Sequence, residues 1–244
     1  IAASTKDSNY SRNPRTDEIT LSDDAAYVHL TSNETIQGVQ FAQFPDVGDR
    51  PLIADMSSDI LSRPFDAHKF ALIYAGAQKN LGPSGVTVVL IRQSWLDTAA
   101  KTPPTMLRYS THAKNNSLYN TPPVFGVYML NLVLDWIEEN GGLEGMAVRN
   151  EQKAALIYSA IDHSNGFYRG HAATPDRSRM NVTFRLPSEA LEKQFVAEST
   201  AAHMVGLGGH RSVGGIRASI YNAMTLEGCQ ALASFMGEFA RKNG

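Results

Sequence analysis

The chain has 244 residues, and 22 lysines and arginines stand against 24 aspartates and glutamates, which gives a formal net charge of −2. This near balance gives no electrostatic reason to expect nucleic acid or an anionic membrane as a partner, and no apolar run approaches the roughly 20 residues of a membrane-spanning helix. The single cysteine, Cys229, excludes an intramolecular disulfide and a cysteine-based structural zinc site. Because no signal-peptide pattern is present either, we expect a reducing, cytoplasmic setting.

Four short apolar runs predict strands of a covered sheet in the first part of the chain. They are residues 27–30, 52–56, 70–75 and 86–91. The polar stretch 102–121 follows, with paired prolines at its edges, and predicts an extended loop.

Helical spacing begins after this stretch. Residues 124–137 predict a helix with an apolar packing stripe, which ends at Asn140 and two glycines, and 143–163 predict a second helix. The remainder predicts an α+β arrangement, namely a strand at 180–186, a helix at 188–204, a glycine-rich loop at 206–215, a strand at 216–221 and a helix at 226–241. We therefore expect a domain boundary near Asn140, with residues 1–140 in one domain and 141–244 in another.

A lysine, Lys79, lies in the small-residue segment 75–85 between two of the predicted strands. Ligands of α/β proteins gather at such strand ends. A lysine becomes a nucleophile when its pKa falls from about 10.4 toward about 7–8 in a confined site. A solvated lysine in a turn is the competing interpretation, and this segment alone favours it.

Asp55 ends an apolar strand 24 positions before Lys79, so the two side chains could lie at the same end of neighbouring strands. A carboxylate and a lysine facing one pocket suit a pyridoxal 5′-phosphate site. The lysine would hold the cofactor aldehyde as a Schiff base, and the carboxylate would keep the pyridine nitrogen protonated. The competing interpretation is that Asp55 caps the turn into Ser57.

Three long motifs in consistent order resemble the phosphoserine aminotransferases, a class-V family of pyridoxal phosphate enzymes. They are Ala54-Asp55-Met56-Ser57-Ser58, Tyr74-Ala75-Gly76-Ala77-Gln78-Lys79-Asn80-Leu81-Gly82-Pro83 and Gly209-His210-Arg211-Ser212-Val213-Gly214-Gly215-Ile216-Arg217-Ala218-Ser219. The resemblance extends over essentially the whole chain and includes segments 31–38 and 119–123. It implies an α/β, aspartate-aminotransferase-like fold (fold type I), with part of a large, mainly parallel sheet domain followed by a smaller C-terminal α+β domain.

The resemblance also implies roles for individual residues. Lys79 matches the Schiff-base lysine, Asp55 the partner of the pyridine nitrogen, Gln78 a ligand of the cofactor phosphate and Thr35 a hydroxyl near the ring oxygen. Asn120 and Thr121 match residues that reach the cofactor phosphate of the neighbouring subunit, which implies a homodimer. The family interconverts phosphoserine plus 2-oxoglutarate with 3-phosphohydroxypyruvate plus glutamate in serine biosynthesis, and in bacteria it also serves pyridoxine biosynthesis.

Three cationic side chains in and beside the glycine-rich loop suit these substrates, because each substrate carries two anionic ends. Arginine binds a planar carboxylate through two parallel hydrogen bonds. By resemblance, Arg217 holds the α-carboxylate, while His210 and Arg211 bind the phosphate or the distal carboxylate. Without the resemblance, solvated side chains in a flexible loop would be the favoured interpretation.

The family's phosphate-binding turn, its cofactor-stacking aromatic residue and its N-terminal His-Arg pair have no counterpart in this sequence. We therefore expect a C-terminal fragment, and a second chain carrying the missing part is one way to complete the site. The alternatives are another class-V enzyme, such as a serine or alanine–glyoxylate aminotransferase, and an inactive fragment. The remaining histidines show no metal-ligand spacing, so we expect no metal site.

Overall fold

The structure is a computed structural model that describes residues 1–244. Its strands are β1 (Val28–Thr31), β2 (Asn33–Glu34), β3 (Val39–Gln40), β4 (Leu52–Asp55), β5 (Leu72–Gly76), β6 (Thr87–Ile91), β7 (Arg169–Gly170), β8 (Asn181–Arg185) and β9 (Ile216–Ser219). Its α-helices are α1 (Gln93–Asp97), α2 (Tyr109–Lys114), α3 (Val124–Glu139), α4 (Gly142–Asp162), α5 (Glu189–Ala201) and α6 (Leu226–Asn243). Short 3-10 turns occur at Lys6–Ser8, Thr16–Glu18, Ala67–Lys69, Thr105–Leu107 and Thr174–Asp176.

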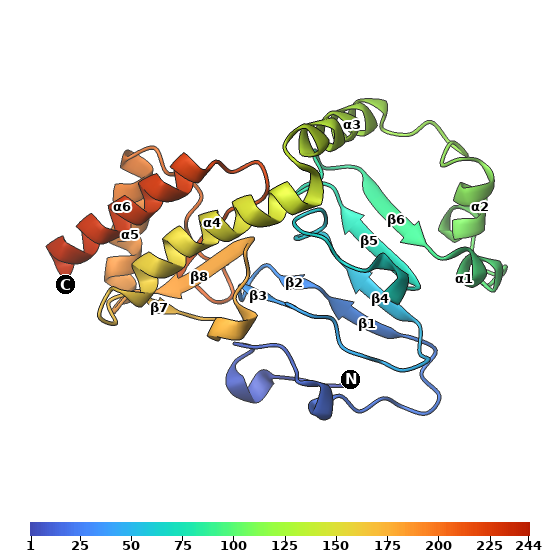
Figure 1. The fold of residues 1–244 in the computed structure, drawn as a ribbon, viewed down its shortest axis with the longest axis horizontal. Coiled ribbons are helices and arrows are strands. Elements are labelled where there is room, and N and C mark those ends of the chain that lie inside the picture. Colours follow the sequence, from blue (N-terminus) through green and yellow to red (C-terminus); the bar gives the residue numbers. More distant parts are fainter.

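The first part of the chain forms a four-stranded sheet in the order β1-β4-β5-β6. Strands β1, β4 and β5 run parallel, and β6 pairs with β5 in the antiparallel direction. The four predicted strands are therefore confirmed, and the mainly parallel α/β sheet with them (Figure 1). Central strands of such a sheet are buried on both faces, which is why β4 reads as an unbroken apolar run that ends at Asp55.

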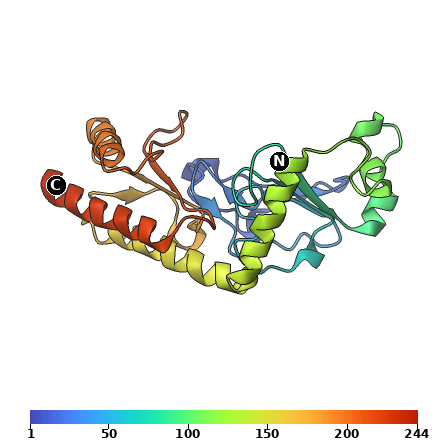
Figure 2. The same ribbon diagram turned by 90° about the horizontal axis from the view of Figure 1, so that it is seen from above.

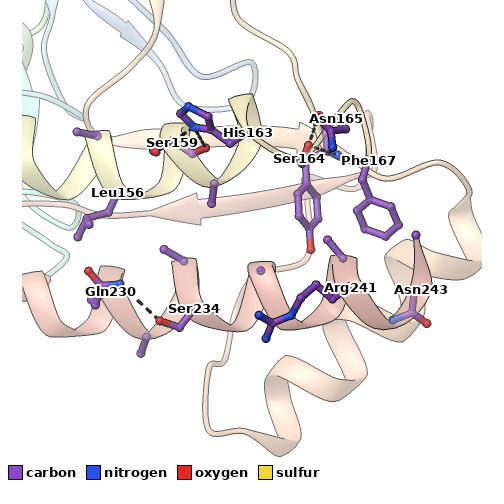
Figure 3. A pocket seen from close by; sticks show the side chains of 18 of the residues that line it. Leu156, Ser159, His163, Ser164, Asn165, Phe167, Gln230, Ser234, Arg241 and Asn243 are labelled. Carbon is purple, nitrogen blue, oxygen red and sulfur yellow. Dashed lines mark hydrogen bonds between the residues drawn. The ribbon is translucent and has the colours of Figure 1, made fainter.

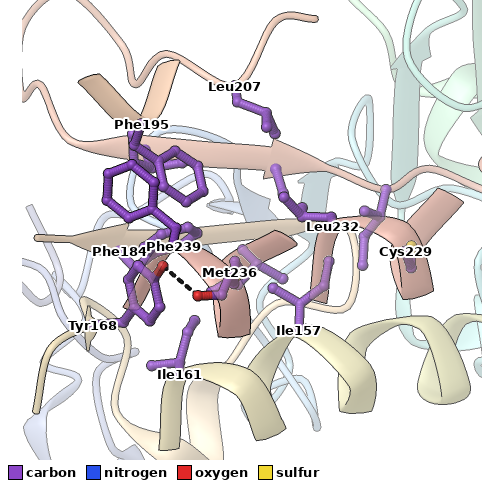
Figure 4. Packing of buried hydrophobic residues seen from close by; sticks show 14 of the residues in the cluster. Ile157, Ile161, Tyr168, Phe184, Phe195, Leu207, Cys229, Leu232, Met236 and Phe239 are labelled. Atoms are coloured by element: carbon purple, nitrogen blue, oxygen red, sulfur yellow. Dashed lines mark hydrogen bonds between the residues drawn. The ribbon is translucent and has the colours of Figure 1, made fainter. Parts of the chain in front are cut away.

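The last part of the chain packs α4, α5 and α6 around a three-stranded antiparallel sheet, β7-β8-β9. Sixteen buried hydrophobic residues form its core, where Phe195 meets Phe184 and Tyr168 edge to face (Figure 4). Ser188 caps α5 and Thr225 caps α6, each by accepting a hydrogen bond from a backbone N–H three residues on. The helices and strands predicted for residues 143–241 are all present.

The stretch 102–121 is not the extended loop that its composition predicts. It contains a 3-10 turn at Thr105–Leu107 and the helix α2, and α1 precedes it. The prolines lie outside these elements, in positions where they mark helix boundaries without preventing the turns between them.

The predicted packing stripe along α3 is also wrong. Gly126 and Ile137 are buried, and Leu130 and Val133 lie near the turn at Gly82. In contrast, Phe125 is 72% exposed and Tyr128 is 59% exposed. Because α3 is apolar on nearly every side, periodicity could not show which face turns toward the sheet.

The molecule has two separate hydrophobic clusters, one of ten buried residues between Val47 and Leu81 and one of sixteen between Ala154 and Phe239. The elements from β1 to α3 are called the sheet unit (residues 28–139), and those from α4 to α6 the C-terminal unit (residues 142–243). We propose that this division, with its boundary at residue 140, is the domain boundary expected from the sequence. Both views show α4 leading from α3 into the C-terminal unit (Figures 1 and 2).

Buried side-chain amides join the two units. Asn222 accepts a hydrogen bond from Asn150 Nδ2 at 2.8 Å and donates from its own Nδ2 to the Leu61 carbonyl at 2.9 Å. Its backbone N–H donates to Asn80 Oδ1 at 2.9 Å, directly beside Lys79. Buried polar atoms need such partners, so the contacts fix the C-terminal unit against the turn that carries Lys79.

We expect Asn222→Ala to lower the free energy of unfolding by about 1–3 kcal/mol, because it leaves the Leu61 carbonyl and one Asn150 N–H without a partner. Urea denaturation followed by circular dichroism measures the change. Asn131→Ala, at an exposed position of α3, is the control and should stay within about 0.5 kcal/mol of the parent. Equal stability of the two variants would contradict a structural role for Asn222.

None of the helices combines the length and the apolar character that crossing a membrane requires. No group of three or more His, Cys, Asp or Glu side chains is arranged to hold a metal ion.

Candidate active site

Asp55 and Lys79 lie at the carboxyl ends of adjacent parallel strands. Asp55 is the last residue of β4 and is paired in register with Tyr74 of β5. The chain leaves β5 at Gly76 and closes a tight turn in which the Gly82 N–H donates to the Ala77 carbonyl at 2.8 Å. This turn carries Lys79 at the edge of the sheet where ligands of α/β folds bind.

The Lys79 amine is partly buried and donates a hydrogen bond from Nζ to Thr35 Oγ1 at 2.7 Å. Burial is the largest influence on it and lowers its pKa below the ordinary lysine value of 10.5. The negative charges of Asp55 and Glu34 oppose this shift, and the positive charge of Arg217 adds to it. A larger fraction of this amine is therefore uncharged near neutral pH than in a solvated lysine, as a nucleophile or a base requires.

Thr35 reaches Lys79 because a short antiparallel hairpin, β2–β3, crosses from the sheet unit to the C-terminal unit. The Thr183 hydroxyl of β8 donates to the Gln37 carbonyl at 2.7 Å, and the Ser178 N–H donates to the Gly38 carbonyl at 2.9 Å. Gly38 has a φ of +72°, and a Cβ there would approach the Asn181 carbonyl oxygen to 2.7 Å. Only glycine fits both requirements, so the hairpin is tightly seated.

The Asp55 carboxylate accepts a hydrogen bond from the Ser57 N–H at 2.8 Å through Oδ1. The turn-capping interpretation of Asp55 is thus geometrically real. This hydrogen bond uses one oxygen of the carboxylate. The negative charge of Asp55 still acts to raise the pKa of Lys79 and that of Tyr74.

Tyr74 and His29 are site neighbours that the sequence reasoning did not select. The two rings stack at a centroid distance of 5.9 Å, and His29 Nε2 lies 3.0 Å from the Tyr74 hydroxyl. Burial, followed by the nearby charge of Asp55, raises the pKa of Tyr74. A polar ring near the end of an otherwise apolar strand, at the same sheet edge as Asp55, is the signal that could have identified Tyr74.

The strand β9 brings a third charged group toward this edge. Arg217 lies opposite Thr183 in β8, and its guanidinium has no side-chain hydrogen bond or ion pair within the chain. It lines a small pocket of about 170 Å³ together with His210, Gln37 and Arg185. An arginine without an internal partner, at the wall of a pocket near a lysine, is available for an external anion.

His210 and Arg211 lie in the glycine-rich loop that precedes β9. The loop folds into a turn in which the Val213 and Gly214 N–H groups donate to the His210 carbonyl. His210 Nδ1 is 2.7 Å from the Ser212 hydroxyl, and Arg211 is exposed.

The other predicted ligands are not drawn into this centre. Gln78 is exposed, with its amide lying over Gly76. Asn120 and Thr121 are exposed between α2 and α3, and neither forms a hydrogen bond with Lys79 or Asp55. Their role in a partner subunit's site stays a prediction from the resemblance.

A large groove elsewhere on the molecule has a different character. It lies between α4 and α6 on the C-terminal unit, with a volume of about 2020 Å³ (Figure 3). Small residues line much of it, with Leu156, His163 and Arg241 among the larger ones. It contains none of the predicted site residues.

The chemistry of the donor set fits pyridoxal phosphate. Lys79 offers an amine with a lowered pKa for an aldehyde, and the carboxylate of Asp55 lies at the end of the neighbouring strand. Thr35 supplies a hydroxyl already oriented toward the amine. Gln78 is an exposed amide in the same turn, one residue before Lys79.

Comparisons with known proteins agree with this arrangement. A family model described as "Aminotransferase class-V" matches residues 1–232. The phosphoserine aminotransferase of Herpetosiphon aurantiacus is 66% identical over 244 residues, which cover all of this chain and 68% of that protein.

Solved structures give the same result. The phosphoserine aminotransferase from Bacillus circulans subsp. alkalophilus has a TM-score of 0.98 and 63% identity, over all of this chain and 68% of that one. An aspartate aminotransferase from Thermus thermophilus has a TM-score of 0.79 at 20% identity, over 96% of this chain and 69% of that one. The second likeness shows the fold alone, and that fold is the aspartate-aminotransferase-like arrangement expected from the sequence.

Proposed function

Since this chain belongs to the class-V aminotransferases, a family of pyridoxal phosphate-dependent enzymes, we propose that it transfers the amino group between phosphoserine and 2-oxoglutarate. The main support for the proposal is the Lys79 amine. It donates a hydrogen bond to Thr35, and the charges of both Asp55 and Arg217 act on its pKa. The reverse direction uses 3-phosphohydroxypyruvate and glutamate, in the pathway to serine.

Pyridoxal phosphate supplies an aldehyde that takes up the amino group and a protonated ring that withdraws electrons from the substrate α-carbon. Lys79 would hold the cofactor covalently when no substrate is present. The substrate amine would displace it, and the freed Nζ would then accept the α-carbon proton and return it. Asp55 holds the proton at the ring nitrogen, and Thr35 orients the Lys79 amine through its hydroxyl. Gln78 of this chain, with Asn120 and Thr121 of the neighbouring subunit, binds the cofactor phosphate.

Arg217 binds the α-carboxylate, and His210 with Arg211 binds the distal phosphate or carboxylate. The free guanidinium of Arg217 supports its role, because a cation without an internal partner keeps its binding capacity for substrate. The pair His210 and Arg211 also favours substrates with two anionic ends over serine, alanine or glyoxylate. A cysteine desulfurase is a further alternative, which would need a reactive cysteine on a mobile loop. Cys229 does not suit that role, because it is buried and burial raises its pKa to about 11.

The same site could act on a phosphorylated hydroxy-amino acid of the pyridoxine pathway, which carries the same charged groups. We further propose a cytoplasmic homodimer. The exposed apolar side chains of α3, Phe125 and Tyr128 among them, support a subunit interface there, because exposed apolar surface marks interaction sites. A phosphate-binding turn supplied from outside residues 1–244 would complete the cofactor site.

Substrate preference tests the proposed reaction. With pyridoxal phosphate and 2-oxoglutarate present, phosphoserine should be a far better amino donor than serine or alanine, as measured by glutamate formation. A preference for alanine with glyoxylate would overturn the proposal in favour of the rival enzyme class.

Arg217→Lys should raise KM for phosphoserine by about 10- to 100-fold, because a lysine cannot make the paired hydrogen bonds of a guanidinium, and hydrogen bonds to charged groups contribute about 1.5–3 kcal/mol. Steady-state kinetics give this constant, and absorbance titration gives the affinity for the cofactor, which should change little. Arg179→Lys is the control, because Arg179 pairs with Glu151 on the outside of the C-terminal unit. Unchanged KM values for both phosphoserine and glutamate would contradict a role of Arg217 in binding substrate.

A further inference from the structure

Arg185, at the end of β8, makes contacts that lead directly to the glycine-rich loop. Its Nε donates to Glu192 Oε1 at 2.6 Å, and its Nη1 donates to the Val213 carbonyl at 2.7 Å. One guanidinium thus joins α5 to the loop that carries His210 and Arg211. None of the three motifs discussed above contains Arg185 or Glu192.

The Glu192 side chain is 9% exposed, whereas that of Arg185 is 42% exposed. A nearly buried carboxylate needs a charged or hydrogen-bonding partner. Glu192 accepts from the Arg185 guanidinium and, more weakly at 3.3 Å, from the Leu186 N–H. Glu192 also lies in the first turn of α5, where the helix dipole favours a negative charge. The carboxylate is therefore a fixed anchor, and it holds the arginine in one orientation.

The loop is shaped to receive this arginine. Gly214 and Gly215 have φ values of +70° and +73°, and a Cβ on Gly215 would come within 2.7 Å of Arg185 Cδ. A side chain at Gly215 would strike the arginine, whereas a Cβ at Gly214 would lie 3.4 Å from its guanidinium. Both glycines therefore supply the backbone conformation, and Gly215 also supplies the space. Arg185 also lines the small pocket that His210 and Arg217 share.

The loop itself has few other restraints. Besides its own turn, the Gly209 N–H donates to the Gly215 carbonyl at 2.8 Å, and the Arg217 N–H donates to the Leu207 carbonyl at 2.9 Å. A segment with five glycines at 206–215 loses much conformational entropy on ordering. The hydrogen bond from the Arg185 guanidinium to the Val213 carbonyl is the one side-chain contact from β8 that offsets this loss of entropy.

We propose that Arg185, anchored by Glu192, is a positioning residue that holds the glycine-rich loop folded, with His210 and Arg211 set for the distal anionic group of the substrate. Only the last step, the binding of substrate by His210 and Arg211, rests on the proposed function. The contacts that hold the loop do not depend on any activity.

Limited trypsin digestion reports on the loop without any assay of activity, because Arg211 is itself a trypsin site in the exposed part of the loop. In the full chain with bound pyridoxal phosphate, Arg185→Gln should speed cleavage after Arg211 at least fivefold, as followed by mass spectrometry. Arg185→Lys should give an intermediate cleavage rate, because an ammonium group can bind Glu192 or the Val213 carbonyl but lacks the planar fork that lets a guanidinium bind both. Arg179→Gln, which breaks the exposed ion pair with Glu151, is the matched control and should leave the rate unchanged.

Steady-state kinetics then connect the loop to substrate. Arg185→Gln should raise KM for phosphoserine about tenfold while kcat stays within twofold, since the residue acts on the loop and not on the reacting atoms. Glu192→Gln is a milder change, because the side chain keeps an oxygen acceptor. It should raise both the cleavage rate after Arg211 and KM for phosphoserine, each by less than Arg185→Gln does.

A cleavage rate after Arg211 equal to that of the parent in Arg185→Gln overturns the proposal, even if the variant melts at a lower temperature. Faster cleavage with an unchanged KM for phosphoserine overturns the link from the loop to substrate. Faster cleavage in a protein that transaminates no phosphorylated substrate refutes the proposed function and leaves the loop anchor supported.

Discussion

Replacing Lys79 by alanine should lower the turnover of phosphoserine by about 10³-fold or more. Proton transfer by a positioned side chain alone contributes about 10²- to 10⁴-fold, and the Lys79 amine also provides the covalent attachment of the cofactor. The hydrogen bond from Nζ to Thr35 at 2.7 Å shows that the amine already occupies a defined position. Glutamate formation from phosphoserine and 2-oxoglutarate, measured with saturating pyridoxal phosphate, gives the loss.

Folding should survive this change. Lys79 is partly buried and loses one hydrogen bond, which costs about 0.5–1.5 kcal/mol. Lys69→Ala, at an exposed lysine of the short turn before β5, is the control and should keep full activity. Parent-like turnover in a folded Lys79→Ala protein would end the proposed mechanism.

The second large effect is expected for Asp55→Asn. The asparagine oxygen can still accept from the Ser57 N–H, so the turn is kept while the negative charge is lost. Without that charge, the ring nitrogen of the cofactor is no longer held protonated, and kcat should fall by about 10²- to 10³-fold, the range observed when one electrostatic contact to a transition state is removed. Asp66→Asn is the matched control, because Asp66 likewise accepts from an N–H two residues on, that of His68.

The same variant makes a pH prediction. The charge of Asp55 raises the pKa of Lys79, against the larger lowering by burial. Cofactor capture by the apo chain needs the uncharged amine, so its rate should rise with pH and level off below the ordinary lysine value of 10.5. In Asp55→Asn the midpoint should move to a still lower pH. Stopped-flow absorbance over a pH series measures it. A midpoint that stays in place, together with parent-like kcat, would mean that Asp55 only caps a turn.

Parts of this site could be predicted because they depend on local pattern. Short apolar runs identified β4, which ends at Asp55, and β5, which Lys79 follows. Parallel neighbours place their carboxyl ends together, so Asp55 and Lys79 could be expected at one edge. The glycine-rich loop before β9 could be predicted for the same reason, because clustered glycines indicate a loop in the local sequence.

Other parts depend on contacts between distant segments, which no local pattern encodes. The short hairpin that brings Thr35 to Lys79 has strands of two residues each, too short for any period to show. The bridge through Asn222 joins residues 61, 80 and 150 by hydrogen bonds of single amides. In α3, nearly uniform apolarity left the direction of the buried face undetermined, and the predicted stripe there was wrong.

Borohydride reduction followed by peptide mapping shows which lysine carries the cofactor. The purified chain is incubated with pyridoxal phosphate, reduced and digested, and the modified lysine is located by mass spectrometry. The cofactor mass should be found on the peptide containing Lys79, and the visible absorbance of the bound cofactor should disappear on reduction. Label on another lysine, such as the buried Lys153, or no label at all after incubation with excess cofactor, would contradict a pyridoxal phosphate site at Lys79.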